Sequence, residues 1–186
     1  SRLKPNDFST LPKLKTILST GSPLSNENFK YVYANIKSDV LLGSISGGTD
    51  IISCFALANP MLPVEEGELQ SIGLGMDVHA FNENGKKVID KKGELICSSV
   101  FPSMPIYFWN DPNNKKYKDA YFSKYKNIWH HGDFIRISKK GNMKIFGRSD
   151  ATLNPGGVRI GTSEIYRIVE KINEISDSLV VGQSWK

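Results

Sequence analysis

Four short stretches of this sequence combine glycine with residues that bind phosphates, hydroxyl groups or metal ions. They are TGSPLS (20–25), SISGGTD (44–50), WHHGD (129–133) and GRSDATLNPGGVRIG (147–161). The last stretch places two arginines and an aspartate among four glycines and a proline. Such a stretch is typical either of a mobile surface loop or of a cradle for an anion, and only the cradle needs the charges.

Thr49 and Asp50 have the chemistry of a phosphate and metal site. They follow Gly47–Gly48 and the apolar run DVLLGSI (39–45), which we predict to be a buried strand ending in a glycine loop. Open α/β sheets bind ligands at the carboxyl ends of their strands. A hydroxyl can donate to a phosphate oxygen, and a carboxylate can hold Mg²⁺ directly or through water. The alternative for these residues is an Asx turn.

Asp133 and Arg148 have the chemistry of a sugar and phosphate site. A carboxylate that accepts two hydrogen bonds matches the adjacent hydroxyls of a ribose, and a guanidinium fifteen residues later could reach the same sugar or a nearby phosphate. The alternative is a salt bridge between the two side chains, worth about 0 to 1 kcal/mol. We assign no catalytic role to His130 and His131, because adjacent side chains on a strand point to opposite faces.

Two amphipathic helices are predicted to frame these stretches. Apolar residues recur at i, i+3, i+4 and i+7 over 29–36 and again over 165–172. Ser25 is placed to cap the first helix, and the tripeptide GSP (21–23) precedes it, where proline is expected on structural grounds. Backbone N–H groups at such a terminus can also face a nucleotide. After the second helix, SLVV (178–181) predicts the start of a buried strand.

Residues 67–109 predict antiparallel β-structure, either a small sheet or a barrel. Short alternating runs are broken by turn residues, and Asn84–Gly85 favours a type I′ hairpin. DFIRI (133–137) and MKIFG (143–147) predict a second hairpin, and 147–161 begins where it ends.

The composition excludes several classes of protein. The 186 residues are 39% hydrophobic and 23% charged, which is typical of a globular chain. The net charge of +5 comes mostly from lysine pairs beside turn residues, without interleaved aromatics, which favours a solvated surface over nucleic-acid binding. Cys54 and Cys97 form no CxxC motif, so neither a disulfide framework nor a zinc site is indicated and a reducing, cytoplasmic location is expected. No apolar run approaches the roughly 18 residues of a membrane span.

In their order and spacing, the four stretches resemble those of the adenylate-forming acyl-CoA synthetases, which join a carboxylic acid to AMP and then to coenzyme A. The resemblance covers nearly the whole chain and implies an α/β fold. Residues 1–149 would be the C-terminal portion of the large adenylation domain, with a mixed sheet and a small β-barrel. Residues 150–186 would be the hinge and the start of the small α+β domain. Because an initiator methionine and counterparts of the family's phosphate loop and essential lysine are missing, we expect a fragment of a longer protein.

The resemblance also implies a role for individual residues. Asp50 would bind Mg²⁺, and Thr49 and Arg159 would be catalytic. Asp150 would be the hinge, and the glycines of 147–161 would free the backbone for a domain rotation. The further contacts implied with ATP and coenzyme A are those of Gly21, Ser22 and Pro23 with adenine, Asp133 and Arg148 with ribose, Thr49 and Arg159 with phosphate, and Gly156 and Gly157 with the pantetheine arm.

Ser46, Gly47 and Gly48 would border the nucleotide and the acid. In relatives that activate acetate, a tryptophan stands at the position of Gly47. A glycine there would open room for a longer acid such as acetoacetate. The alternative is that this glycine serves only the turn.

The implied activity is an ATP- and Mg²⁺-dependent ligation of acetoacetate to coenzyme A through acetoacetyl-adenylate, with release of AMP and pyrophosphate. Alternatives are a ligase for another short-chain acid and a nucleotide-binding module without catalysis. The expected partners are these small molecules, without nucleic acid or membrane, and the sequence indicates no oligomeric state. We expect residues 1–186 alone to be inactive.

Overall fold

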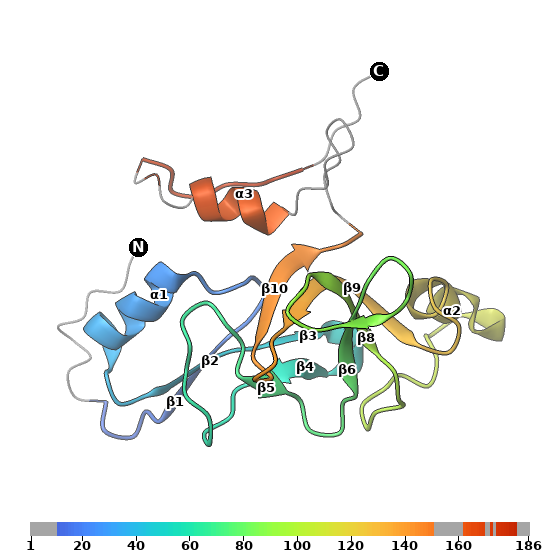
Figure 1. The fold of residues 1–186 in the computed structure, drawn as a ribbon, viewed down its shortest axis with the longest axis horizontal. Helices are drawn as coiled ribbons and strands as arrows, with labels where there is room; N and C mark the ends of the chain where they lie inside the picture. Colours follow the sequence, from blue (N-terminus) through green and yellow to red (C-terminus); the bar gives the residue numbers. More distant parts are fainter. Residues whose placement is uncertain (1–10, 151–161, 170–171, 173, 182–186) are drawn as a thin grey trace.

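The computed structural model describes residues 11–150, 162–169, 172 and 174–181. They form three β-sheets with short helices at their margins (Figure 1). In chain order the elements are β1 (Thr16–Ser19), α1 (Asn26–Tyr31), a π-helical turn (Val32–Ile36), β2 (Leu41–Ser44), β3 (Ser46–Gly48), a 3-10 turn (Thr49–Ile51), β4 (Ser53–Leu57), β5 (Ser71–Ile72), β6 (Val78–Phe81), β7 (Lys87–Val88), β8 (Gly93–Cys97), a 3-10 turn (Pro112–Asn114), α2 (Lys115–Tyr121), β9 (Trp129–Ile137), β10 (Met143–Arg148) and α3 (Thr162–Val169).

The first sheet pairs β1 in parallel with β2, and α1 lies between them in the sequence. The predicted helix is confirmed. Ser25 caps its N-terminus by accepting a hydrogen bond from the backbone N–H of Asn28, and Phe29 is fully buried. The predicted buried strand is also confirmed, as β2. This sheet brings the chain after β1 and the chain after β2 to the same edge.

The second sheet, β3-β4-β5, corrects one prediction. Gly47 and Gly48 do not form a loop after β2 but lie in β3, which pairs antiparallel with β4. A Cβ on Gly47 would stand 2.0 Å from the carbonyl oxygen of Ser53, so the strands can approach this closely only because residue 47 has no side chain. Thr49 and Asp50 therefore lie in the 3-10 turn at the end of a short strand.

The third sheet has the strand order β10-β9-β8-β6-β7 and is antiparallel throughout. Both predicted hairpins are confirmed, as β6–β7 and β9–β10. The predicted barrel is not found in the described part of the chain. At one edge β7 is only two residues long and pairs with β6, whereas at the other edge Met143 of β10 bridges to Leu69. The sheet is therefore open and is joined to the segment before β5.

The turn of the β6–β7 hairpin differs from the predicted type I′. Gly85 has a φ of +69°, but Asn84 is not among the residues with positive φ. The backbone N–H of Gly85 donates to Asn82, and that of Asn82 donates to Lys86. This is a three-residue loop built on a type I turn followed by a left-handed glycine. This loop needs a positive φ angle only at Gly85, whereas a type I′ turn would need one at Asn84 as well.

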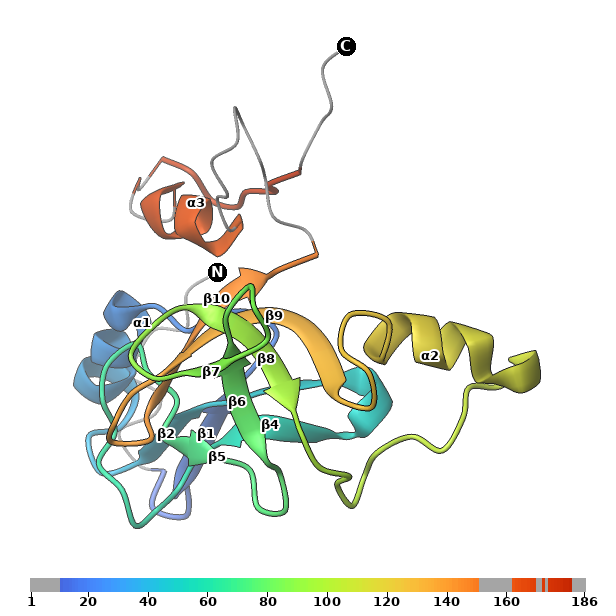
Figure 2. The ribbon, with the colours of Figure 1, turned by 45° about the vertical axis from the view of Figure 1, so that its right-hand side comes forward.

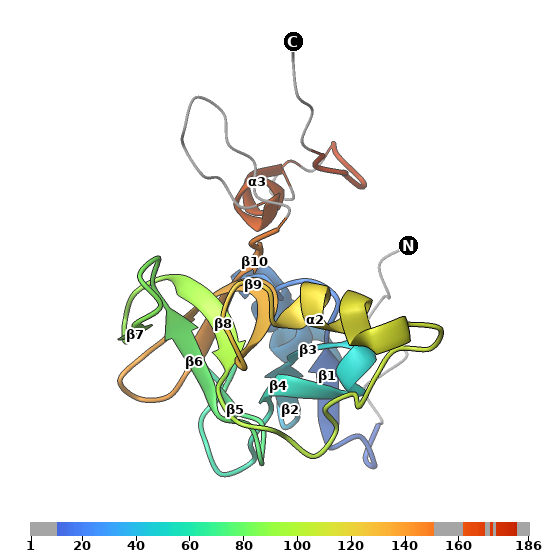
Figure 3. The same cartoon turned by 90° about the vertical axis from the view of Figure 1, so that its right-hand side faces the viewer.

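The core lies between the second and third sheets, whose ribbons face one another in Figure 3. Phe101 presents its ring edge-on to Phe55 and to Trp129, with centroids 5.5 and 5.4 Å apart. Helix α2, at the end of the molecule away from β1 in Figure 2, stacks Tyr121 on Trp129 with ring centroids 3.6 Å apart. This helix was not predicted. Tyr117 and Tyr121 have helical spacing, but the run around them is otherwise mostly polar.

The helix predicted near residue 165 is confirmed as α3, which lies beyond the end of β10 (Figure 1). The strand predicted at 178–181 is wrong. Within the described part of the chain, residues 174–181 pair with no strand, and the side chains of Leu179 and Val181 are exposed. Among the described residues, no helix combines the length and apolar character needed to cross a bilayer.

Candidate functional site

A pocket of about 490 Å³ lies where the first sheet, the second sheet and the β9–β10 hairpin meet. Residues from all four glycine-containing stretches line it. Its lining consists of Thr20, Gly21, Ser22, Pro23, Ser44, Ile45, Ser46, Gly47, Gly48, Thr49, Ser53, Cys54, Leu69, Asp133, Ile145, Gly147 and Arg148. The structure therefore brings together nearly all described residues for which we predicted a role. Arg159, Gly156 and Gly157 lie outside the described residues, and Asp50 and Asp150 do not line the pocket.

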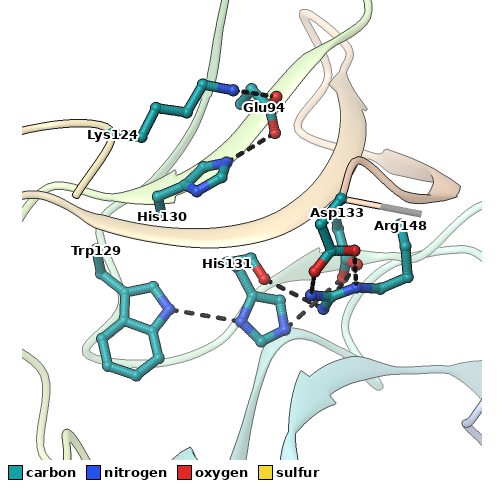
Figure 4. Close-up of polar contacts among 8 residues, drawn as sticks. Glu94, Lys124, Trp129, His130, His131, Asp133 and Arg148 are labelled. Atoms are coloured by element: carbon teal, nitrogen blue, oxygen red, sulfur yellow. Dashed lines mark hydrogen bonds and ion pairs between the residues drawn. The ribbon is translucent and has the colours of Figure 1, made fainter. Parts of the chain in front are cut away.

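Asp133 and Arg148 face each other across the β9–β10 hairpin, in which they are register partners. The guanidinium Nη1 lies 3.4 Å from Oδ1 of Asp133 and donates to the carbonyl oxygen of His131 over 3.2 Å (Figure 4). A register irregularity between Ile145 and Arg148 gives β10 the bend that brings this side chain over β9. The salt-bridge alternative is thus realised, and the same pair also lines the pocket.

Asp150 is the stronger partner of Arg148. The Nε of Arg148 donates to one carboxylate oxygen over 2.9 Å, and Nη2 donates to the other. This two-pronged bond raises the pKa of Arg148 above its ordinary value. Both side chains are about half exposed. The residue for which a hinge role is predicted is therefore tied to a side chain that lines the pocket.

Burial raises the pKa of Asp133 from its ordinary value, although the His131 ring and the Arg148 guanidinium oppose this effect. Asp133 is only 8% exposed. Its carboxylate lies 3.4 Å from Nη1 of Arg148 and 3.7 Å from Nε2 of His131, and both distances are long for an ion pair. A buried carboxylate with such long contacts can accept stronger hydrogen bonds from a ligand.

Thr49 lines the pocket, whereas Asp50 lies beside it with its side chain exposed. The Asp50 carboxylate accepts a hydrogen bond from the hydroxyl of Tyr121. No group of three or more histidine, cysteine, aspartate or glutamate residues in the described chain could hold a metal ion by itself. Mg²⁺ is commonly held by one or two carboxylates together with substrate phosphates and water, so Asp50 beside Thr49 fits a magnesium–phosphate site.

Gly47 does not open the pocket in the way predicted. Its missing side chain faces β4, where a Cβ would also stand 2.6 Å from the Cα of Cys54. A tryptophan at position 47 would collide with this backbone rather than fill the pocket. Gly21, in contrast, has a φ of +91° and open space where a Cβ would stand, beside Ser22 and Pro23. The close strand pairing, rather than the size of an acid, explains glycine at position 47.

The two histidines of β9 do point to opposite faces, as predicted (Figure 4). Nε2 of His130 lies 2.9 Å from Glu94, which also accepts from Lys124. His131 does not line the pocket but is buried behind the wall residues Gly47 and Gly48, and its Nε2 lies 3.1 Å from the carbonyl oxygen of Gly47. The sequence analysis assigns no role to His131. The pattern that could have indicated one is its spacing of two residues from Asp133, since side chains at i and i+2 of a strand lie on the same face.

The comparisons with known proteins agree with this geometry. No family model matches the chain. The chain is 56% identical over 176 residues to an acetoacetyl-coenzyme A synthetase of Rhizobium meliloti, covering 95% of the chain and 27% of that protein. It is also 56% identical over 182 residues to the acetoacetyl-CoA synthetase of Gallus gallus, covering 97% of the chain and 27% of that protein. The chain thus spans about a quarter of the length of the curated relatives that it matches.

Solved structures of acyl-CoA ligases share the fold of this chain. The acetoacetyl-CoA synthetase from Streptomyces lividans superposes with a TM-score of 0.82 at 44% identity, over 90% of this chain and 26% of that one. An anthranilate CoA ligase in complex with anthranoyl-AMP superposes with a TM-score of 0.68 at 19% identity, over 86% of this chain and 29% of that one, which shows the shared fold alone. The resemblance found in the sequence is therefore confirmed: over nearly its whole length, this chain is similar to one part of the acetoacetyl-CoA synthetases, within the adenylate-forming acyl-CoA synthetases.

Proposed function

We propose that this chain belongs to an ATP-dependent ligase that joins acetoacetate to coenzyme A through acetoacetyl-adenylate and releases AMP and pyrophosphate. One observation supports it above the others. Residues from four separated stretches, in the order found in the adenylate-forming acyl-CoA synthetases, line a single pocket. The similarity to acetoacetyl-CoA synthetases over at least 95% of the chain supports the same proposal.

In this proposal the pocket holds the nucleoside part of ATP. Gly21, Ser22 and Pro23 contact the adenine, since the open space over Gly21 leaves the backbone accessible. The Asp133 carboxylate accepts hydrogen bonds from the ribose hydroxyls. Because the carboxylate is ionised, these bonds would be shorter and stronger than its 3.4 Å contact with Arg148. Arg148 holds the same sugar or the nearby phosphate with its planar guanidinium. These residues bind and orient the nucleotide for attack by the acid.

The phosphates lie at the other end of the pocket in this proposal. Thr49 donates its hydroxyl to a phosphate oxygen, and Arg159 contacts the α-phosphate. Asp50 would hold Mg²⁺, which when bound would neutralise the charge that develops on the phosphates. Since the acid carboxylate attacks phosphorus directly, the protein contributes mainly position and charge. Ser46, Gly47 and Gly48 form the wall against which the reactants lie.

The second half-reaction, in which the thiol of coenzyme A attacks the acyl carbon of the adenylate, requires a domain rotation. We assign residues 1–149 to the large domain and 150–186 to the hinge and small domain, with Asp150 as the hinge. Gly156 and Gly157 leave room for the pantetheine arm. The bond between Arg148 and Asp150 supports this assignment because it joins the pocket to the first hinge residue. Release of that bond would accompany the rotation.

The identity of the acid rests on the relatives, since the direction of Gly47 does not explain a preference for acetoacetate. A ligase for another short-chain acid is therefore the second candidate. Competition between acetate, acetoacetate and butyrate in the full-length protein separates the two. Acetoacetate should give the highest kcat/KM, and a higher value for another acid would favour the second candidate. We also assign the protein to the cytoplasm, in keeping with its free cysteines Cys54 and Cys97.

The experiment that tests the function is acid-dependent release of pyrophosphate. We expect the full-length protein to release pyrophosphate with ATP, Mg²⁺ and acetoacetate, and to form acetoacetyl-CoA when coenzyme A is added. Residues 1–186 alone should release none, since they span about a quarter of the length of the curated relatives. Nucleotide binding without turnover by the full-length protein would favour a binding module instead. Turnover by residues 1–186 would show that our proposal is wrong to place the essential lysine outside these residues.

A further inference from the structure

We propose that His131 is a positioning residue that fixes the pocket wall Gly47–Thr49 relative to Asp133 and Arg148. The side chain holds one wall through a hydrogen bond to Gly47, while the main chain holds the other through a hydrogen bond from Arg148. The consequence for turnover rests on the proposed function, whereas the consequence for the geometry of the pocket does not.

The contacts of the His131 ring define its tautomer. The Gly47 carbonyl can only accept a hydrogen bond, so Nε2, 3.1 Å away, must carry a proton. The Trp129 indole can only donate, and its Nε1 lies 3.5 Å from Nδ1, so Nδ1 is the acceptor. Burial lowers the pKa of His131, while the Asp133 carboxylate and the hydrogen bond to Gly47 oppose this effect and the Arg148 guanidinium adds to it; the His130 imidazole also lies nearby. The imidazole is therefore neutral, with Nε2 donating to Gly47 and Nδ1 accepting from Trp129.

The shape of the neighbouring wall is fitted to this ring. Gly48 has extended backbone angles, φ −148° and ψ 152°, which any residue adopts, so backbone conformation does not require glycine there. A Cβ at position 48 would stand 2.8 Å from Cε1 of His131. Glycine at 48 is thus explained by the space that the ring occupies. The ring is held from another side by Phe55, edge-on at a centroid distance of 4.9 Å.

His131 therefore connects the two walls of the pocket. Its side chain fixes the backbone that leads into Thr49, and its carbonyl oxygen accepts from Nη1 of Arg148 over 3.2 Å. The ring also lies 3.7 Å from Oδ2 of Asp133. A ring with its Nε2 proton committed to Gly47 is poorly placed to act as a general base. Its effect on a reaction is exerted through the groups that it positions.

The test uses the full-length protein with His131→Leu and His131→Gln, and with His79→Gln as a control at a partly buried histidine of β6 that does not line the pocket. Leucine leaves the Gly47 carbonyl without its donor, so we expect kcat/KM for ATP to fall about 100-fold, as a misplacement of about 1 Å can cause. The terminal amide of glutamine can donate in place of Nε2 and should restore activity to within about 10-fold. Unchanged kcat/KM in His131→Leu, or equal loss in both variants, would overturn the proposal.

A second measurement covers the case in which His131→Leu does not fold. Gly48→Ala should weaken binding of ATP about 10-fold in the wild-type background, because the methyl group meets the ring. In the His131→Asn background, whose side chain has no atom at the position of Cε1, Gly48→Ala should weaken binding of ATP by less than about 3-fold. Equal costs in the two backgrounds would overturn the proposal.

Nitrogen NMR of His131 distinguishes failure of this proposal from failure of the proposed function. We expect the spectrum of a neutral Nε2–H tautomer in the absence of any ligand, whether or not the protein releases pyrophosphate. A protonated ring or an Nδ1–H tautomer at pH 7 would overturn the positioning role. Absence of acid-dependent pyrophosphate release from the wild-type protein, with this tautomer present, would overturn the proposed function alone.

Discussion

The two faces of strand β9 carry clusters of similar composition in different electrostatic states (Figure 4). On one face Glu94 is joined to Lys124 and His130, and although burial raises the pKa of this carboxyl, these hydrogen bonds lower it to about 2. On the other face burial raises the pKa of Asp133, and its nearest charged partner is 3.4 Å away. A carboxylate satisfied by its own protein stabilises the fold, whereas one with long contacts is available to a ligand.

The largest expected effect follows from breaking the satisfied cluster. Glu94→Gln removes the charge that Lys124 and His130 share, and should lower the free energy of unfolding by about 3 kcal/mol. Urea denaturation measures the loss. The matched control is Glu66→Gln, which removes an exposed ion pair to Lys30 and should cost no more than about 1 kcal/mol. Similar losses in the two variants would mean that the Glu94 cluster is not the stabilising one.

Acid titration sharpens the same contrast. The folded pKa of Glu94 is depressed, so its contribution to stability is present above its ordinary pKa of 4.5 and is lost as the pH falls to about 2. The wild-type protein should lose roughly 3 kcal/mol from this group over that range. The raised pKa of Asp133 acts with the opposite sign, because its contribution is present at low pH and is lost as the pH rises. Glu94→Gln should therefore flatten the acid loss, and Asp133→Asn should steepen it. Parallel curves for both variants would contradict this assignment.

Removal of the Asp133 charge should affect binding rather than stability. Asp133→Asn relieves a buried carboxylate with long contacts, so we expect the free energy of unfolding to change by less than about 1 kcal/mol. The affinity for ATP should fall about 10- to 100-fold, the cost of losing hydrogen bonds to a charged group. Isothermal titration calorimetry measures this affinity, with the exposed Asp39→Asn as control. A large loss of stability with unchanged affinity would reverse the roles of the two faces.

The difference between the faces could be predicted only in part from the sequence. Alternation separates His130 from His131, and the four stretches indicate that Asp133 and Arg148 approach each other. Which carboxylate is satisfied depends on Lys124, thirty residues from Glu94 in the sequence, and on the fold that brings them together. The direction of Gly47 depends on the pairing of β3 with β4, which no local pattern specifies. Elements with a clear apolar period and hairpins between neighbouring strands were therefore predictable, whereas α2 and the contacts between strands distant in the sequence were not.

The smallest effect on stability is expected at Asp150, the residue of the proposed hinge. The Arg148–Asp150 pair is about half exposed on both sides, so Asp150→Asn should lower the free energy of unfolding by less than about 1 kcal/mol. If Asp150 is the hinge, the same change should slow thioester formation about 10-fold, because that step follows the rotation. Adenylate formation, measured as pyrophosphate released in a single turnover, should change less than about twofold. Equal slowing of both half-reactions would place Asp150 with Asp133, as a residue that holds the nucleotide through Arg148, rather than with the rotation.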